Sequence, residues 1–477
     1  MTRLLRPTAV ERDLQRNQLT NTEPLFRKVL IANRGEIAVR ISRTLREMGI
    51  PSVVVYSDAD VGAAHVEAAD EAFHVGPPMP AQSYLNQDRL FEITRESGVD
   101  AIHPGYGFLS ENAVFAGRCA EEGLTFIGPP PDVIEAMGSK IAARRAAKDA
   151  GMPVVPGTEE PMSDAGAITA VAGGLGYPVA IKAAAGGGGY GMRVASTPGE
   201  VEATLDGVRR DAGRAFGDTT VYVEKFFSPA PRHVEIQILG DRLGNVVHLG
   251  ERECSLQRRF QKIVEETPSP GISPELRQRM GESAVTLARH MGYQSAGTIE
   301  CLVTDDGEFY FLEMNTRLQV EHPVTEEVTG VDLVREMVRI AAGHPLSIPE
   351  QGIGPRGHAI EARIYAEDPS RNFMPSPGKI TQLNFPVLPN LRVDTGARVG
   401  TNVTVYYDPM IAKVIAWGED RAAAIQTMRD ALDGTNVEGV KTNIPFLQRI
   451  FAGEDFGAGR IHTRYVDERL GDIMRVA

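Results

Sequence analysis

The chain has 477 residues, of which 42% are hydrophobic and 24% are charged, the ordinary balance of a globular protein with two or three domains. Its formal net charge of −13 argues against a general binder of nucleic acid or of anionic membranes, since both need a basic surface. The cysteines, Cys119, Cys254 and Cys301, are far apart and form no CxxC pair, so we interpret them as reduced thiols of a cytoplasmic protein.

Residues 1–25 are expected to form an N-terminal extension. They mix basic and acidic residues and lack the apolar core of a signal peptide. No apolar run anywhere in the sequence approaches the roughly 20 residues of a membrane span, so we expect no insertion into a membrane.

Residues 26–140 are predicted to form a domain around a parallel sheet. Apolar strands over 28–32 and 51–56 flank a helix with apolar residues at helical spacing, and this βαβ start is typical of α/β folds. No GxGxxG follows the first strand, so the fingerprint of nicotinamide binding is missing. The segment 100–107 predicts a strand that runs into a glycine-rich loop, after which Ser110 is a candidate helix N-cap.

A run of glycines lies between two apolar strands in the next domain, residues 141–227. The strands are expected over 177–185 and 192–195, with the glycine-rich loop over 186–191. A Walker loop would need a helix after the glycines and a GK[ST] end, so we interpret this hairpin as a flap whose backbone amides fold over phosphates. A flexible linker is the alternative, although a linker is seldom framed by two apolar strands.

Alternating strands are predicted on both sides of a charged run. The strand over 220–227 has a polar end suited to an adenine edge. The segments 233–238 and 360–365 alternate as half-buried strands do, the second with Arg363 on its polar side. The charged run over 251–262 is, by itself, typical of a solvated face.

A hairpin later in the sequence is predicted to bring two carboxylates together. Its loop is expected to centre on Asp306 and Gly307. Glu300 then lies directly opposite Glu313, at about 4.5–5.5 Å between Cβ atoms, where like charges repel each other. A cation would remove the repulsion, and the amide oxygen of Asn315 would complete a set of hard ligands suited to Mg²⁺ carrying phosphates. The alternative is a surface hairpin with solvated acids.

Polar residues continue at a spacing of two through and beyond the second strand of this hairpin. In an extended chain they would share one face, which indicates a site rather than a solvated surface. The residues on this face are Glu313, Asn315, Arg317, Gln319 and Glu321.

Six motifs, in this order, resemble those of the biotin carboxylases, which are ATP-grasp enzymes. They are IANRGEIAVRI (31–41), HPGYGFLSEN (103–112), KAAAGGGGYGMR (182–193), RHVEIQ (232–237), ERECSLQRR (251–259) and EMNTRLQVEHPVTE (313–326). The resemblance covers residues 26–470. It implies an α/β (α+β) fold with a Rossmann-like N-terminal domain over 26–140, an ATP-grasp lid over 141–227, an ATP-grasp core over 228–345 with the metal and bicarbonate site, and a mixed α/β C-terminal domain over 346–470.

The resemblance also implies the residues of the site. Contacts to ATP fall on Lys140, Lys182, Gly188, Gly189, Glu224, Lys225, Phe226, Phe227, His233 and Phe260. The ligands of Mg²⁺ or Mn²⁺, with two ions expected, fall on Glu300, Glu313 and Asn315. The bicarbonate site falls on Lys262, Arg317, Gln319, Val320 and Arg363, the general base on Glu321, and the biotin side on Arg363 and Tyr106. Tyr190 and Phe260 replace polar residues of the family pattern, and we expect them to change nucleotide affinity rather than chemistry.

The implied reaction is the ATP- and bicarbonate-dependent carboxylation of biotin through carboxyphosphate. Glu321 would deprotonate bicarbonate, and Arg317 and Lys262 would hold the anion. Arg363 would stabilise the enolate-like oxygen that develops on biotin.

The resemblance implies partners as well. Because the chain has no M-K-M attachment sequence, biotin is expected on a separate biotin carboxyl carrier protein, with separate carboxyltransferase subunits. The complete enzyme is expected to be an acyl-CoA carboxylase, most often the acetyl-CoA carboxylase of fatty acid biosynthesis, with a propionyl-CoA or pyruvate carboxylase as the alternative. A homodimer is implied, with contacts on Arg40, Arg43, Glu47 and Arg392; the alternative for the helix that carries the first three is a solvated face.

Two other functions compete with this one. Another ATP-grasp ligase, making an acyl phosphate from a different acid, would share the ATP, metal and flap residues but would not need the bicarbonate and biotin residues. A catalytically inactive nucleotide-binding subunit is the second, and the presence of Lys140, Glu300 and Glu321 argues against it.

Overall fold

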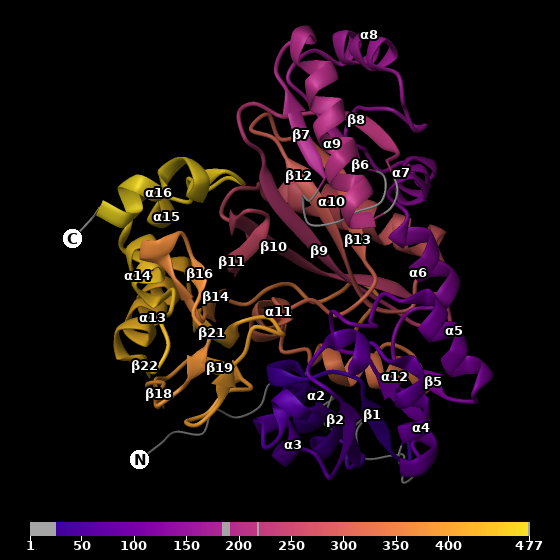
Figure 1. The fold of residues 1–477 in the computed structure, drawn as a ribbon, viewed down its shortest axis with the longest axis vertical. Coiled ribbons are helices and arrows are strands. Elements are labelled where there is room, and N and C mark those ends of the chain that lie inside the picture. The colour runs from indigo at the N-terminus through magenta and orange to yellow at the C-terminus, as the bar shows by residue number, and fades with distance from the viewer. Residues whose placement is uncertain (1–24, 184–190, 217–218, 476–477) are drawn as a thin grey trace.

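The computed structural model describes residues 25–183, 191–216 and 219–475. Figure 1 shows three parts: an N-terminal α/β unit, a small lid at the opposite end of the molecule, and a long antiparallel sheet between and beside them. In these described ranges we find no helix with the length and apolar content needed to cross a membrane. The cysteines are all buried and free.

The N-terminal unit is built on a five-stranded sheet in the order β3-β2-β1-β4-β5, and every pairing is parallel. Helices cover both faces, so the central strands are buried and apolar throughout, which confirms the predicted Rossmann-like domain. Its elements are β1 (Val29–Ile31), α2 (Gly35–Glu47), β2 (Ser52–Ser57), α3 (Ala64–Ala68), β3 (Glu71–Gly76), α4 (Gln87–Ser97), β4 (Ala101–His103), α5 (Ala113–Glu121), β5 (Thr125–Phe126) and α6 (Pro131–Gly138).

One predicted helix cap in this unit is wrong. The side chain of Asn112, not that of Ser110, accepts a hydrogen bond from the backbone N–H of Phe115 and caps α5. Ser110 lies in the turn before the helix and is buried. Both residue types make good caps, so the sequence alone could not decide which one starts the helix.

The lid is a three-stranded antiparallel sheet in the order β7-β6-β8 with helices packed on it. The predicted hairpin is present, because Lys182 on β6 pairs with Met192 on β7, and the glycine-rich loop between them lies outside the described residues. The lid elements are α7 (Lys140–Asp149), α8 (Ala165–Leu175), β6 (Val179–Ala183), β7 (Met192–Ala195), α9 (Val201–Phe216) and β8 (Val221–Lys225).

The long sheet has eight antiparallel strands in the order β13-β12-β9-β10-β11-β14-β21-β19. It crosses the domain boundary predicted at residue 346, because β11 pairs with β14. The strands are β9 (Arg232–Gly240), β10 (Val246–Arg258), β11 (Gln261–Thr267), β12 (Ser295–Val303), β13 (Phe309–Asn315), β14 (His358–Tyr365), β19 (Leu391–Thr395) and β21 (Met410–Gly418).

The two faces of strand β14 in the long sheet have different surroundings. On β14, Ile360, Ala362 and Ile364 belong to the core beneath α13 and α14, so the alternate residues Glu361 and Arg363 point to the other side. The helices around the sheet are α10 (Pro274–His290), α11 (His322–Thr329), α12 (Leu333–Ala341), α13 (Arg421–Gly434) and α14 (Ile444–Ala452).

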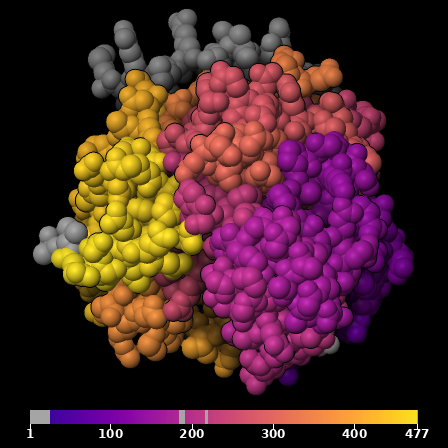
Figure 2. Space-filling view, turned by 90° about the horizontal axis from the view of Figure 1, so that it is seen from above, coloured from indigo at the N-terminus to yellow at the C-terminus, as the bar shows by residue number. Residues whose placement is uncertain are grey.

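The C-terminal helices lie beside the lid, and several short strands complete the C-terminal region (Figure 1). Seen from above, the lid in magenta and the C-terminal helices in yellow lie side by side (Figure 2), and the Arg464 guanidinium stacks 5.3 Å from the ring centre of Phe226. The short elements are β15 (Glu367–Asp368), β16 (Met374–Pro375), β17 (Gly378–Lys379), β18 (Gln382–Asn384), β20 (Asn402–Val403), β22 (Asn436–Glu438), α15 (Glu454–Gly457) and α16 (Tyr465–Arg475).

The charged run over 251–262 is not a solvated face. Most of it belongs to β10, in the middle of the long sheet, where Glu251, Arg252 and Glu253 are all buried. Each of them has partners of opposite charge or polar partners, which is what allows such a run to be buried.

Candidate active site

The predicted carboxylate pair is present at the edge of the long sheet. Glu300 on β12 and Glu313 on β13 face each other in the register of the two strands. A register shift just after this pair, between Glu300 and Cys301, takes up one extra residue of β13. Burial and the neighbouring Glu300 raise the pKa of Glu313, as expected of two facing acids. These two carboxylates fit a divalent cation, since a cation would relieve the repulsion that raises this pKa.

The polar residues after the hairpin lie together at the site, but the backbone that carries them is not the predicted extended strand. Strand β13 ends at Asn315, so the chain is not extended as far as Glu321, which lies in a turn at the start of α11. The residues still converge, because Asn315 Nδ2 and Gln319 Nε2 donate to Glu300 Oε1 at 2.9 and 2.8 Å. Arg317 donates to the amide oxygen of Asn315 at 2.7 Å.

Lys262 is the centre of the ion network. Its ammonium group lies 2.5 Å from Glu235, 2.8 Å from Glu300 and 2.7 Å from Glu321. Although burial lowers the pKa of the Lys262 ammonium, these three carboxylates outweigh that effect and hold it well above its ordinary value. Lys262 in turn contributes to lowering the pKa of Glu321 well below that of a free glutamate. The lysine and Glu321 are therefore both ionised near neutral pH.

Arg363 connects Glu321 to the next strand of the sheet. Its Nη2 lies 3.0 Å from Glu321 Oε2 and 2.5 Å from Glu265 Oε1. The network therefore runs without a break from the paired carboxylates on β12 and β13, through Lys262 and Glu321, to Arg363 on β14.

Sequence reasoning assigned no role to Arg252, which is fully buried at the base of the site. It donates to Glu235 at 2.6 Å and to Gln319 Oε1 at 2.7 Å, and so fixes two residues that border the network. The only signal in the sequence was its place in a charged run, which does not distinguish a buried arginine from a solvated one.

His233 lies beside Glu300, one of the two carboxylates predicted to bind the metal. Its Nε2 is 3.1 Å from Glu300 Oε2, and this carboxylate is the main factor that raises the pKa of the buried His233 imidazole despite desolvation. His233, predicted to contact ATP, is thus part of the same cluster as Glu300.

The lid carries the other basic residues predicted to contact ATP. Lys182 on β6 bonds to Glu224 at the end of β8, and so does Arg144 on α7, a residue that was not predicted at the site. Lys140, the first residue of α7, lies near both the lid sheet and the long sheet. Burial and the positive charge of Lys182 lower the pKa of its ammonium group, whereas the negative charge of Glu313 raises it. A pocket of about 210 Å³ lies behind these residues, between α7 and Tyr222.

The other side chains predicted to contact the nucleotide lie in different surroundings. Lys225 donates to the backbone oxygen of Gly176 at 2.7 Å, and Phe227 stacks on Tyr310 at 5.0 Å between ring centres. Phe260, in the turn between β10 and β11, has a left-handed backbone with φ 66° and a side chain that is 54% exposed. Three predicted residues, Gly188, Gly189 and Tyr190, lie outside the described residues.

The predicted biotin-side residue Tyr106 lies close enough to Arg363 for the arginine charge to oppose the rise in the pKa of its hydroxyl that burial and Glu36 cause. Its hydroxyl donates to Glu36, which is also 3.1 Å from the buried ammonium of Lys413. Lys413 donates to the backbone oxygen of Val320 at 2.8 Å and so supports the turn that carries Glu321. The N-terminal unit thereby reaches the site through a tyrosine and a glutamate.

The residues predicted at a dimer contact lie on and near α2. Arg40 is buried within the chain, and both Arg40 and Arg392 lie 2.8 Å from the carboxylate of Glu326. Arg43 and Glu47 have side chains that are 48% and 54% exposed. Arg43 and Glu47 are therefore the two of the four predicted residues whose charged groups face solvent.

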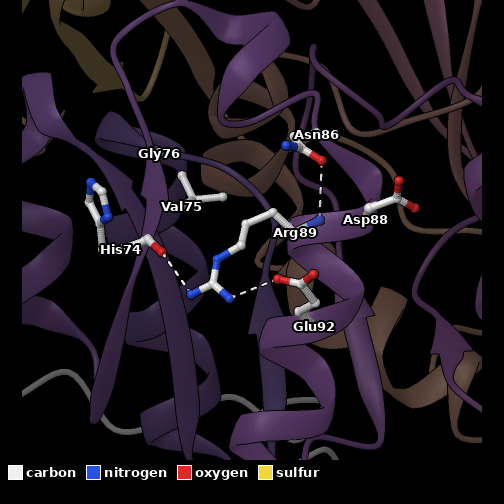
Figure 3. A pocket seen from close by; sticks show the side chains of 7 residues that line it. All are labelled: His74, Val75, Gly76, Asn86, Asp88, Arg89 and Glu92. Atoms are coloured by element: carbon white, nitrogen blue, oxygen red, sulfur yellow. Dashed lines mark hydrogen bonds and ion pairs between the residues drawn. The ribbon is translucent and has the colours of Figure 1, made fainter.

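A larger pocket lies elsewhere and has no part in this site. It measures about 430 Å³ and lies at the edge of the N-terminal sheet, between β3 and α4 (Figure 3). Arg89, in its centre, already donates to Glu92 at 3.0 Å and to the backbone oxygen of His74 at 3.2 Å. None of the predicted site residues lines it.

Comparison with known proteins identifies the three parts. Residues 25–134 match the model of the biotin carboxylase N-terminal domain, 139–349 the ATP-binding domain of the carbamoyl-phosphate synthase L chain, and 361–468 the biotin carboxylase C-terminal domain.

The relatives of this chain have several names. Biotin carboxylase 2 of Bacillus subtilis is 50% identical over 94% of this chain and 100% of the relative. A pyruvate carboxylase subunit from Methanothermobacter thermautotrophicus is 51% identical over 93% and 90%, and the propionyl-CoA carboxylase alpha chain of Ruegeria pomeroyi is 49% identical over 93% and 68%.

Solved structures show the same fold. The biotin carboxylase domain of Hydrogenobacter thermophilus 2-oxoglutarate carboxylase, in complex with MgADP, ADP and bicarbonate, has a TM-score of 0.91 at 45% identity, covering 95% of this chain and 99% of that one. Biotin carboxylase from Campylobacter jejuni has a TM-score of 0.90 at 43% identity, covering 93% and 99%. The chain therefore belongs to the biotin carboxylase family, whose members are ATP-dependent ligases.

Proposed function

We propose that this protein carboxylates biotin on a separate carrier protein, with ATP and bicarbonate as co-substrates and carboxyphosphate as the intermediate. The observation that carries the proposal is the unbroken ion network from Glu300 through Lys262 and Glu321 to Arg363. Such a network brings a metal-binding carboxylate, a base and a cation together in one site, as a reaction with an anionic intermediate requires.

ATP would lie between the lid and the long sheet. Lys140, Lys182 and His233 supply positive charge on that side, and similar solved structures contain MgADP and bicarbonate. Glu300, Glu313 and Asn315 would hold Mg²⁺ or Mn²⁺, with two ions expected, and the metal would screen the charge of the γ-phosphate.

Glu321 would act as the general base on bicarbonate. Its pKa is far below the ordinary value because Lys262, Arg363 and Arg252 stabilise the carboxylate, so it is ionised and able to take a proton. Bicarbonate would reach it by displacing part of the contact with Lys262 and Arg363. Lys262 and Arg317, together with Gln319 and Val320, would then hold the bicarbonate anion, and attack on the γ-phosphorus would give carboxyphosphate.

Arg363 would serve the second half-reaction. Carboxyphosphate would break down to CO₂ and phosphate, and the phosphate would remove the proton from the ureido nitrogen of biotin. The guanidinium of Arg363 would stabilise the developing enolate-like oxygen, with Tyr106 beside it.

The two half-reactions can be separated by experiment. Arg363→Gln keeps a donor but loses the charge, so it should keep most of the bicarbonate-dependent ATP hydrolysis while biotin carboxylation falls by about 10²–10³. Glu321→Gln should lose both activities, because neither proceeds without deprotonated bicarbonate. The measurement is ADP release and carboxybiotin formation in parallel, with free biotin. Equal losses of both activities in Arg363→Gln would contradict the assigned role.

The acyl-CoA substrate belongs to the complete enzyme. We propose an acetyl-CoA carboxylase that works with a biotin carboxyl carrier protein and carboxyltransferase subunits, as a cytoplasmic homodimer whose contact includes Arg43 and Glu47. Relatives named for pyruvate and propionyl-CoA make these two the alternatives. Purification of the complex through this chain, followed by acetyl-CoA-, propionyl-CoA- and pyruvate-dependent bicarbonate fixation, decides between them.

A further inference from the structure

Two buried glutamates lie beside Arg363 and take no part in the chemistry proposed above. Glu265 on β11 and Glu361 on β14 are direct partners in the register of these strands, and both are fully buried. Directly facing residues of an antiparallel pair have Cβ atoms about 4.5–5.5 Å apart, and two like charges there destabilise the sheet. The pair therefore needs a cation or a proton between its carboxyl groups.

The cations nearby are engaged with other groups. Arg363 lies 2.5 Å from Glu265 and 3.0 Å from Glu321, so its Nη2 already serves two carboxylates. Lys413, which pairs with Arg363 across β14 and β21, donates to the oxygen of Val320 and to Glu36.

Glu361 is left without a partner for its charge. Neither carboxyl oxygen of Glu361 has a hydrogen-bond partner, although the residue is 0% exposed. An ionised carboxylate in such a place costs several kcal/mol, so a buried acid without a partner takes up a proton instead.

Other charged groups on this face are also paired or neutral. The His322 imidazole on α11 has its pKa held well below the ordinary value by burial and by Lys413, and Arg392 and Asp394 on β19 lie 2.6 Å from each other. Lys262 is surrounded by Glu235, Glu300 and Glu321. Further titratable groups around the pair are Glu326, which bonds to Arg40 and Arg392, and Tyr365. The buried Cys254 thiol is also near, and burial raises its pKa well above the ordinary value, so it is neutral.

We propose that Glu265 and Glu361 hold one proton between them, carried by Glu361, and that this pair positions Arg363 between Glu265 and Glu321. The inference rests on the role proposed above for Arg363. If Glu361 were ionised as well, a third carboxylate would pull the guanidinium back toward the sheet and away from the biotin side. With the proton in place, the pair carries a single negative charge and Arg363 keeps its outward contact with Glu321.

The titration behaviour of the pair agrees with this arrangement. Burial raises the pKa of Glu361 well above its ordinary value, with Glu265 and Glu321 adding to the shift and Lys413 opposing it. The same burial raises the pKa of Glu265 to about 7, and Arg363 holds that value down. The proton therefore belongs on Glu361, the member farther from the arginine charge.

Infrared difference spectroscopy detects the proton directly. Wild type minus Glu361→Gln, recorded at about pH 8 and so far above the ordinary glutamate pKa of about 4.3, should contain the C=O band of a protonated carboxylic acid. The matched control is Glu266→Gln, the next residue on β11, whose carboxylate is bonded to His358 and Arg421 and should give only a carboxylate band. A carboxylate band in the Glu361→Gln difference would overturn the proposal.

Thermal stability gives a second measure of the same proton. The folded pKa of Glu361 is raised, so the folded protein retains a proton that the unfolded chain loses above about pH 4.3, and stability falls as pH rises toward the folded pKa. Glu361→Gln removes this pH dependence. The Tm of the variant should therefore rise relative to the Tm of wild type as the pH increases from about 5 to about 8. A constant Tm difference over this range would count against the shared proton.

The positioning role is tested by kinetics of Glu265→Gln. Loss of this anion should lower kcat for biotin carboxylation on the order of 10–100-fold, the usual effect of removing a residue that orients a functional group, while bicarbonate-dependent ATP hydrolysis stays near wild type. Glu266→Gln should leave both activities near wild type. If Arg363→Gln separates the half-reactions but Glu265→Gln does not, the positioning role is wrong; if Arg363→Gln itself lowers both equally, the error lies in the role proposed for Arg363.

Discussion

At the scale of single residues, the site is a sequence of opposite charges. Glu300, Lys262, Glu321 and Arg363 follow one another at distances of 2.7 to 3.0 Å. Such buried ions are costly when alone, and each is kept ionised by the next. This arrangement suits the proposed binding of bicarbonate, because an anion that enters the network can replace one carboxylate partner of Lys262 or Arg363 without leaving an ion uncompensated.

The residues proposed to bind the metal give the first prediction. Glu300→Gln or Glu313→Gln should reduce MgATP turnover by more than about 10²-fold, since loss of even an outer partner of a metal site costs 10–100-fold. The measurement is ATP hydrolysis as a function of Mg²⁺ concentration. Glu308→Gln, on the same hairpin with a side chain that is 51% exposed, is the control and should behave as wild type. Near-normal turnover of both variants at limiting Mg²⁺ would show that these residues do not bind the metal.

Some residues of the site could be found from the sequence for a clear reason. A turn limits the register of a hairpin, so a loop near Asp306 and Gly307 brings Glu300 close to Glu313. Next to the turn, Val303 pairs with Phe309, one residue away from the expected register, and the shift after Glu300 places the two glutamates opposite each other. Arg252 could not be found in this way. Its partners come from β9, β12 and the turn before α11, and such long-range contacts leave no local pattern.

At the scale of elements, β11 and β14 form the seam between the two halves of the long sheet. Glu266 on β11 lies 2.7 Å from His358 on β14 and 2.6 Å from Arg421 at the start of α13. These bonds hold the pKa of the buried Glu266 below its ordinary value despite desolvation. The seam is thus fastened by a charged group as well as by backbone hydrogen bonds.

The seam gives a pH-dependent prediction. Because the folded pKa of Glu266 is depressed, its stabilisation is present above the unfolded value of about 4.3 and is lost as pH falls through the folded value. Glu266→Gln should therefore destabilise the protein by about 3 kcal/mol at neutral pH, and the difference should shrink on acidification. Calorimetric Tm values at several pH values test this, with the 90% exposed Glu454→Gln as control. A difference that grows toward low pH would contradict the assignment.

Strands were predicted correctly where apolar residues alternate or run together, and they were missed where charged residues obscure that pattern. The strands β1, β2, β4 and β14 follow from their apolar or alternating sequence, whereas the edge strand β3 was not predicted. The run over 251–262 has too many charges to be recognised as an interior strand, because only the tertiary partners of Glu251 and Arg252 make its burial possible. The extended path expected beyond Asn315 failed because α11 starts at His322 and the chain must turn into it.

At the scale of the whole molecule, α2 fastens the N-terminal unit to the long sheet. Arg40 lies 2.8 Å from Glu326 on α11 and 2.9 Å from Asp332, the N-cap of α12. Both partners follow the turn that carries Glu321. The position of the base therefore depends on contacts with a unit that is distant in the sequence.

This contact gives the third prediction. Arg40→Gln removes a buried cation from Glu326, which keeps Arg392 as a cationic partner, and from the partly exposed Asp332. The substitution should lower the free energy of unfolding by about 3 kcal/mol. Arg43→Gln, one turn along on the same helix, removes a half-exposed arginine 3.5 Å from the buried Asp394. Because Asp394 keeps its closer partner Arg392, the free energy of unfolding should change by less than about 1 kcal/mol. Urea unfolding midpoints compare the two. Equal effects would mean that Arg40 does not join the two parts.

The pairing of β11 with β14 also governs what happens when the chain is cut. Residues 264–267 hydrogen-bond to 359–362, and the intervening chain includes an irregular segment over 343–357. A protease nick in that segment would leave two pieces held together by this ladder and by ion pairs such as Lys413 with Glu36 and Arg392 with Glu326. The pieces should co-elute on gel filtration until denaturant separates them. A fragment made to end there would instead expose β11 as a bare edge, which offers its backbone to any other strand and favours aggregation.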